Sequence, residues 1–232
     1  MDGSNSDLWL LLRSGAGDSA FNMAVDEALL EAMPRLDRAV LRFYGWAESA
    51  ASFGYFQKYA DVERLTALRP LVRRLTGGGV VPHEHDWTYS LVFPTTHEWY
   101  SLSAVESYHR VHEWIQAAFA RLELVCQLAP HAVKASPGKC FAGCERFDLL
   151  WNGQKIAGAA QRRRKDGLLI QGSVQPLGFP FSREVWEKAM TEIAQLPRNV
   201  QWVELDLNEA LQNRAINLAR GKYGQEAYRR RR

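Results

Sequence analysis

The sequence predicts an α+β fold in which a mixed or antiparallel β-sheet is flanked by helices. Apolar residues recur with a strand period in several short runs and with a helix period in a few longer ones. The strand-like runs come in groups and do not alternate strictly with helices, which favours a mixed or antiparallel sheet over a parallel one. Hydrophobic residues make up 47% of the 232-residue chain, which is enough for a buried core.

Four helices are predicted, and in the first two the apolar residues share one helical face. Asp18 or Ser19 can cap the first helix. The second has the clearest signal, because Ser103 and Glu106 form a capping box in front of its apolar stripe. The predicted ranges are about 18–32, 104–122, 183–196 and 207–220.

Seven short strands are predicted from runs rich in β-branched and aromatic residues. The last three form a β-meander, because the Asn152-Gly153 and Asp166-Gly167 pairs are strong signals for tight hairpin turns. The predicted ranges are 39–44, 51–56, 71–75, 88–93, 147–151, 155–161 and 168–174.

The chain shows no internal repeat or low-complexity linker, so we expect one domain over residues 1–232 with a helical C-terminal part from about residue 182. The formal net charge is only +3, but basic residues are concentrated in the tail 229–232 and in the run 162–165. We interpret the tail as solvated. The internal run is either a solvated loop or a contact for an acidic protein or nucleic acid.

Composition places the chain among intracellular globular proteins. The three cysteines argue against a disulfide scaffold and fit a reducing compartment. The apolar stretches are too short for a membrane span, and the N-terminus carries no secretory signal. We therefore expect a cytoplasmic protein without a membrane partner.

The first motif with chemical meaning is a triple glycine, Gly77, Gly78 and Gly79, between two strand-like runs. Glycine lets the backbone approach a ligand closely, and successive N–H groups can bind a carbonyl oxygen or a phosphate. Arg73 and Arg74 precede the loop, and only one of them can point to the side of a bound ligand. A flexible turn is the alternative interpretation.

The second motif is a strand of small residues that follows the Asn152-Gly153 turn. Lys155 stands at its base, and after Ile156 only glycine and alanine occur until Gln161. Such a strand either packs under bulky neighbours or forms the wall of a ligand slot. The alternative for Lys155 is a solvent-facing hairpin lysine.

The third motif is a cysteine pair, Cys140 and Cys144, in a segment rich in serine, proline and glycine. Their spacing does not suit a zinc pair, and no second pair exists, so no metal site is expected. Each could be a buried structural thiol or a nucleophile whose thiolate a nearby cation stabilises. The pattern alone does not choose between the two.

These motifs, taken in order from about residue 9 to residue 174, resemble the biotin/lipoate protein ligase superfamily, in its branch of lipoate-protein ligase A and octanoyltransferases. The motifs are Arg42-Phe43-Tyr44-Gly45-Trp46, Phe53-Gly54-Tyr55-Phe56-Gln57, Arg73-Arg74-x-Thr76-Gly77-Gly78-Gly79, His83, Thr88-Tyr89-Ser90, Gly153-x-Lys155-Ile156-Ala157-Gly158-x-Ala160-Gln161 and Gln171-Gly172-Ser173. The resemblance implies the catalytic-domain fold of that superfamily.

In particular, the sequence is similar to cysteine-dependent octanoyltransferases of the LipM type. That resemblance makes Cys140 the acyl-accepting nucleophile and Lys155 the residue that contacts the acyl carbonyl. The sequence departs from the family where its usual His-Asp reads His83-Glu84 and its usual His-Gly-Ser reads Gln171-Gly172-Ser173. The residues expected to bind substrate are Arg73, Gly77, Gly78, Gly79, His83, Ala157, Gly158 and Ala159.

The resemblance implies transfer of an octanoyl group from acyl carrier protein to a lysine of a lipoyl domain, without a cofactor. The lipoyl domain would belong to the glycine cleavage H protein or to a 2-oxoacid dehydrogenase E2 subunit. Alternatives are an ATP-dependent lipoate ligase, which would need ATP and Mg²⁺, and an amidotransferase between lipoyl domains. The non-enzymatic alternative is a degenerate module that binds acyl-proteins or nucleic acid, of which nucleic acid is the less favoured partner.

Overall fold

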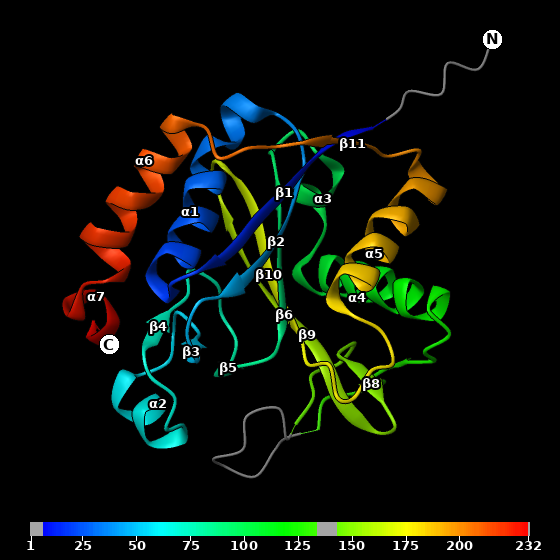
Figure 1. The fold of residues 1–232 in the computed structure, drawn as a ribbon, viewed down its shortest axis with the longest axis horizontal. Coiled ribbons are helices and arrows are strands. Elements are labelled where there is room, and N and C mark those ends of the chain that lie inside the picture. The colour runs from blue at the N-terminus through cyan, green and yellow to red at the C-terminus, as the bar shows by residue number, and fades with distance from the viewer. Residues whose placement is uncertain (1–6, 134–142, 232) are drawn as a thin grey trace.

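The computed structural model of the chain describes residues 7–133 and 143–231, and these residues form a mixed sheet packed between helices (Figure 1). Within them, eight strands make one sheet in the order β11-β1-β2-β6-β10-β9-β8-β7. β1 runs parallel to both β2 and β11, and the other pairs are antiparallel. The strands are β1 (Leu8–Gly17), β2 (Val40–Trp46), β6 (Trp87–Phe93), β7 (Gln127–Leu128), β8 (Leu149–Trp151), β9 (Gln154–Arg164), β10 (Gly167–Val174) and β11 (Gln201–Glu204). The α+β prediction is confirmed.

Helices cover both faces of this sheet (Figure 1). α1 (Ser19–Leu36) and α6 (Glu209–Leu218) lie on one face, and α4 (Ala104–Arg121) and α5 (Arg183–Arg198) on the other. Each face encloses its own apolar core. One core is centred on α1 residues such as Leu29, and the other contains the fully buried Trp186 of α5.

A second, three-stranded sheet carries the glycine loop. Its order is β4-β3-β5, from β3 (Ala50–Phe53), β4 (Leu71–Arg73) and β5 (Val81–His83). The short helix α2 (Tyr59–Leu65) packs against it, and the C-terminal α7 (Glu226–Arg230) lies beside β4 (Figure 1). The remaining elements are α3 (Glu98–Ser101) and a π-helical turn, η1 (Ala219–Tyr223), which joins α6 to α7.

The predicted caps and hairpins form as the local sequence specifies. Asp18 Oδ1 accepts a hydrogen bond of 2.7 Å from the N–H of Phe21, and Ser103 Oγ accepts one of 3.1 Å from Glu106. Asn152 and Gly153 take positive φ angles of 49° and 75° in the turn between β8 and β9. The predicted meander of β8, β9 and β10 is therefore confirmed.

The pattern missed three strands of the large sheet, β1, β7 and β11, and also β5 of the small sheet. β1 begins with Leu8-Trp9-Leu10-Leu11-Leu12, a run without polar alternation, because the strand is covered by helices on both faces. β11 pairs with β1 within the segment where the sequence indicated helices, so this C-terminal part returns to the sheet before α6 begins. None of the helices in residues 7–133 and 143–231 has both the length and the apolar character needed to cross a bilayer.

His112 of α4 gives the fold a predicted acid sensitivity. Its ring is fully buried, Nδ1 donates to the carbonyl of Tyr108 at 2.8 Å, and burial lowers the pKa of His112 to about 4. In the unfolded chain the ring binds a proton near its ordinary pKa of about 6.5. The unfolded state therefore binds more protons between pH 6.5 and 4, and acid in that window destabilises the native state.

We expect this histidine to cost roughly 3 kcal/mol of unfolding free energy as the pH falls from 7 to 4. Urea unfolding at a series of pH values should show a shallower loss in His112→Phe than in the wild type. His109→Gln, which changes a more exposed histidine on the same helix, should keep the wild-type slope. Equal slopes for His112→Phe and the wild type would contradict the expectation.

Candidate functional site

A cavity of about 610 Å³ lies between the glycine loop of the small sheet and strands β9 and β10 of the large one. Its lining includes the loop residues Gly78 and Gly79, the strand residues Gly158, Ala159 and Ala160, and Lys155 at one end. Two motifs about 80 residues apart in the chain therefore face one another across one space. In the sequence they were two separate motifs, and the packing of the small sheet against the large one brings them together.

Arg74 holds the glycine loop from behind. Its guanidinium donates to the carbonyl oxygens of Gly77 and Gly79 at 2.9 and 2.8 Å, and to Ser52 Oγ at 2.8 Å. Burial lowers the pKa of Arg74 to about 10, which still leaves the side chain charged at neutral pH. Gly78 takes a positive φ of 85° in this loop, which the absence of a Cβ allows.

Arg73, the neighbour that was expected to bind substrate, points the other way. It donates to the backbone carbonyls of Tyr55 and Gln57 at 2.8 and 2.7 Å, and to that of Arg229 at 2.7 Å. It thereby joins β4 to the C-terminal helix α7. Arg74, and not Arg73, lines the cavity.

His83 also lines this cavity. It lies between Ser52 and Asp86 in a buried chain of hydrogen bonds. Its Nε2 lies 2.6 Å from Ser52 Oγ, its Nδ1 lies 2.9 Å from Asp86 Oδ2, and its ring stacks on Trp46. Burial lowers the pKa of His83, although the Asp86 carboxylate acts in the opposite direction. Asp86, three residues on, supplies the carboxylate where the sequence offered Glu84.

Lys155 lines the cavity and forms an ion pair with a buried carboxylate. Its Nζ lies 2.6 Å from Asp148 Oδ2, and the Asp148 side chain is fully buried while that of Lys155 is 18% exposed. Tyr108 of α4 donates to the other oxygen of Asp148, and the backbone N–H of Glu145 donates to Oδ2 at 2.6 Å. Lys155 is thus an ion-paired side chain at the cavity wall, and not a solvent-facing hairpin lysine.

The small residues of β9 make room for this lysine. A Cβ at Gly158 would stand 2.9 Å from both Cε and Nζ of Lys155 and 3.0 Å from Asp148 Oδ1, so a side chain there would displace the ammonium. Gly158 and Ala159, which were expected to bind substrate, line the cavity, and their role stays a prediction. Ala157, which was expected to do the same, is buried in the core next to Ile156.

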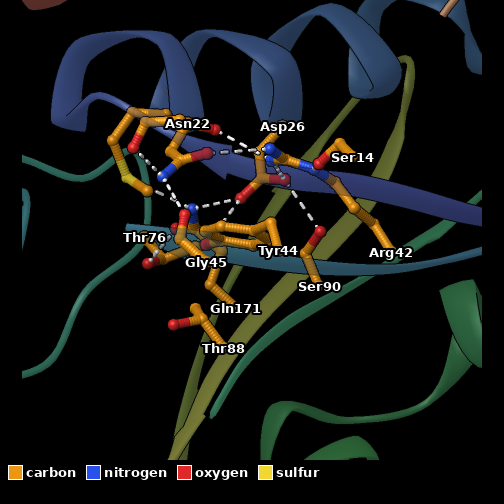
Figure 2. Close-up of polar contacts among 12 residues, drawn as sticks. Ser14, Asn22, Asp26, Arg42, Tyr44, Gly45, Thr76, Thr88, Ser90 and Gln171 are labelled. Carbon is orange, nitrogen blue, oxygen red and sulfur yellow. Dashed lines mark hydrogen bonds and ion pairs between the residues drawn. The ribbon is translucent and has the colours of Figure 1, made fainter. Parts of the chain in front are cut away.

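A buried ion pair joins several elements of the fold and is linked to the cavity through Tyr44 and Gln171, which line it (Figure 2). Arg42 NH1 donates to Asp26 Oδ1 at 2.6 Å, and both side chains are almost completely inaccessible to solvent. Ser90 donates to the same Asp26 oxygen at 2.7 Å, and Gln171 Nε2 donates to the other at 2.7 Å. Strands β2, β6 and β10 are thereby joined to helix α1 through one carboxylate.

Gln171 extends this network to the glycine loop. Its Oε1 accepts a hydrogen bond of 2.8 Å from the hydroxyl of Thr76, which directly precedes Gly77 (Figure 2). The amide therefore spans from the Asp26 carboxylate to the loop. A glutamine is suited to this position because one side chain supplies both the donor and the acceptor.

The two cysteines within the described residues, Cys126 and Cys144, lie in different surroundings. Cys140 lies outside the described residues. Cys144 lines the cavity near Lys155, with Sγ 3.8 Å from the carbonyl oxygen of His131. Burial raises the pKa of Cys126 to about 12, which makes this thiol unreactive at neutral pH.

The basic run of residues 162–165 divides over several contacts. Arg164 NH1 pairs with Glu27 at 2.9 Å, and Arg163 NH2 donates to the carbonyl of Leu102. Arg162 instead lies over the ring of Tyr55, and Arg231 of the C-terminal segment lies over the same ring. The internal run and the C-terminal segment therefore meet at one aromatic residue, which the sequence did not predict.

Among the described residues, no group of three or more histidine, cysteine, aspartate or glutamate side chains could hold a metal ion. The sequence missed Asp148, Tyr108, Asp86 and Ser52 as members of the site. Each is a common polar residue without a local motif, and each becomes informative only when its partner from a distant element is known. Arg74 could have been found, since one of the two adjacent arginines had to face the loop.

Comparison with solved structures shows the fold. Lipoate-protein ligase A bound with ATP matches with a TM-score of 0.77 at 20% identity, covering 97% of this chain and 98% of that chain. A bipartite lipoate protein ligase from Thermoplasma acidophilum matches with a TM-score of 0.72 at 20% identity, covering 97% and 96% of the two chains. The described fold is thus that of the lipoate-protein ligase catalytic domain.

The sequence places the chain more narrowly. The model of the lipoyl protein ligase A/B catalytic domain matches residues 18–175, and the chain belongs to this family. It is 33% identical over 183 residues to octanoyltransferase LipM of Macrococcus caseolyticus, and 36% identical over 179 residues to octanoyltransferase LipM of Lysinibacillus sphaericus. Each match covers 72% of this chain and 65% of the relative, so the matched region spans slightly less than two thirds of these curated relatives.

The buried Asp26–Arg42 pair gives a stability prediction. Asp26→Asn keeps the shape of the side chain but leaves the Arg42 guanidinium without a counter-charge, so we expect a loss of about 3–5 kcal/mol in the free energy of unfolding. Glu204→Gln makes the same chemical change in an exposed pair with Arg13 and should cost below about 1 kcal/mol. Urea unfolding of both variants checks this, and similar losses would contradict a central role for Asp26.

Proposed function

We propose that the chain transfers an octanoyl group from a carrier thioester to a lysine amine of a lipoyl domain, through a thioester on Cys140. The observation that carries the proposal is the Lys155 ammonium, held by Asp148 at the wall of a cavity whose opposite wall is the glycine loop. The similarity to octanoyltransferases LipM supports the same chemistry. The proposed partners are acyl carrier protein as donor and a lipoyl-domain protein as acceptor.

In the first step, the Cys140 thiolate attacks the carbonyl carbon of the donor thioester. The carbonyl oxygen gains negative charge, which the Lys155 ammonium and N–H groups of the glycine loop stabilise. The carbon–sulfur bond to the carrier then breaks, and the carrier thiolate leaves and takes up a proton. The octanoyl group remains on Cys140, and its apolar chain lies in the cavity along the small residues of β9.

In the second step, the neutral amine of the acceptor lysine attacks this acyl-enzyme. The same cation and N–H groups stabilise the second oxyanion, the bond to Cys140 sulfur breaks, and the nitrogen loses its proton. One thioester is exchanged for one amide, so the reaction needs no ATP and no metal ion. Burial lowers the pKa of His83, which lies 2.6 Å from Ser52 and 2.9 Å from Asp86 in the wall of the cavity.

The roles of Asp148 and Arg74 in this scheme are positional. Asp148 holds the ammonium while leaving part of Lys155 exposed to the cavity. Arg74 donates hydrogen bonds to the loop carbonyls of Gly77 and Gly79, so the loop N–H groups are the ones that would donate to the substrate. Because these groups are fixed before the substrate arrives, little reorganisation is needed when the oxyanion forms.

The acyl-enzyme is the first expected outcome. Incubation with octanoyl-acyl carrier protein should add one octanoyl group to the intact mass, and neutral hydroxylamine should remove it. The adduct should be absent in Cys140→Ser and present in Cys144→Ser. The reverse pattern would make Cys144 the nucleophile, and lipoate-dependent exchange of pyrophosphate into ATP would favour a ligase.

The second expectation concerns the cation. Lys155→Met should lower the rate of Cys140 acylation about a hundred- to a thousandfold, the usual cost of losing one oxyanion donor. Lys188→Met, which alters a largely exposed lysine of α5, should leave that rate unchanged. Single-turnover mass spectrometry measures both. Wild-type rates in Lys155→Met would disprove the assigned role.

A further inference from the structure

A second cavity, of about 560 Å³, adjoins the first at Lys155. Lys155, Val133, Gly143 and Cys144 line both cavities. From this junction the first cavity continues along β9 to Ala160. The second continues to the β8–β9 turn at Gly153 and to the segment after β10. The ammonium that would hold the reacting carbonyl therefore stands where two separate spaces meet.

The walls of the second cavity combine apolar surface with side-chain amides. Pro82, Leu150 and Leu177 supply the apolar surface, while Gln154 and Gln175 supply the amides. Gln175 is fixed in place, because its Nε2 donates to Ser173 Oγ at 3.1 Å and its backbone N–H donates to the carbonyl of Ile156 at 2.7 Å. Such a surface suits a neutral chain that carries its own amide groups.

The charge of the lining residues indicates which class of ligand the second cavity can bind. Among the described residues that line the second cavity, Lys155 is the only charged side chain. A nucleoside triphosphate would require several cations for its phosphates, and the ammonium of an acceptor lysine would favour a carboxylate. A neutral, extended ligand needs neither several cations nor a carboxylate.

We propose that the second cavity binds the pantetheine part of the thioester donor, a neutral chain with two amides and a pair of geminal methyl groups. The inference rests on the proposed acyl transfer. The octanoyl chain would occupy the first cavity, the pantetheine arm the second, and the thioester carbon would lie between them beside Lys155. Contacts to the arm are remote from the reacting bond, so they supply binding energy that a shortened donor loses.

Two small donors test this. S-octanoyl-pantetheine carries the whole neutral arm, whereas S-octanoyl-N-acetylcysteamine keeps only the first amide. The measured quantity is the efficiency of Cys140 acylation with each donor, from single-turnover mass spectrometry. We expect the wild type to favour the pantetheine donor by about tenfold, the effect of a few added contacts.

Bulky substitutions from two walls of the second cavity should remove this preference. Leu177→Trp and Gln154→Trp place an indole in the proposed path of the arm, and both positions are exposed enough to accept it. Each should lower the preference at least about fivefold. Val203→Trp, the same change at a 47% exposed position on β11, should leave both efficiencies unchanged.

The outcomes separate this inference from the function on which it rests. No adduct from octanoyl-acyl carrier protein would refute the proposed acyl transfer and the inference together, whereas an adduct from the carrier protein and none from S-octanoyl-pantetheine would refute only the pantetheine site. An adduct from both donors, with equal efficiency or with a preference that both tryptophan variants retain, would refute only the pantetheine site. Competition between ATP and the pantetheine donor would also refute it, by placing a nucleotide in the second cavity.

Discussion

The buried Asp26–Arg42 pair is the interaction on which the site depends. Two opposite charges in an apolar interior are tolerated only when their remaining hydrogen-bonding capacity is used. Here Ser90, Tyr44 and Gln171 converge on the carboxylate, while the guanidinium also donates to the backbone carbonyl of Asn22 at 2.9 Å. These requirements fix α1 against the centre of the sheet, and through Gln171 and Thr76 they set the position of the glycine loop.

Lys155 also pairs with a buried carboxylate, but this ion pair is only partly shielded from solvent. Its carboxylate, Asp148, is as deeply buried as Asp26, but the ammonium remains partly exposed to the cavity. The first pair is therefore closed to solvent, while the second leaves one charged end exposed at the cavity wall. Tyr108 of α4 binds the second oxygen of Asp148, so the position of this cation depends on packing across the opposite face of the sheet.

The sequence predicted what depends on local pattern. The caps at Asp18 and Ser103 and the turn at Gly153 were all predictable, because each is decided within a few residues. The strand β1 was not, since a strand buried on both faces loses its polar alternation. The orientation of Arg73 away from the cavity was also unpredictable, because it depends on α7, which packs beside β4 about 150 residues later.

The C-terminal part braces α1, β4 and β9 from outside the family match, which ends at residue 175. Glu27 of α1, 3% exposed, accepts hydrogen bonds from Lys222 at 2.5 Å and from Tyr223 at 2.7 Å, and pairs with Arg164 at the end of β9. These contacts lower the pKa of Glu27, although its burial acts the other way. The π-helical turn brings Lys222 and Tyr223 to this carboxylate, and α7 then reaches Arg73. The π-helical turn before the last helix and the cavity strand β9 are thus held by one buried acid.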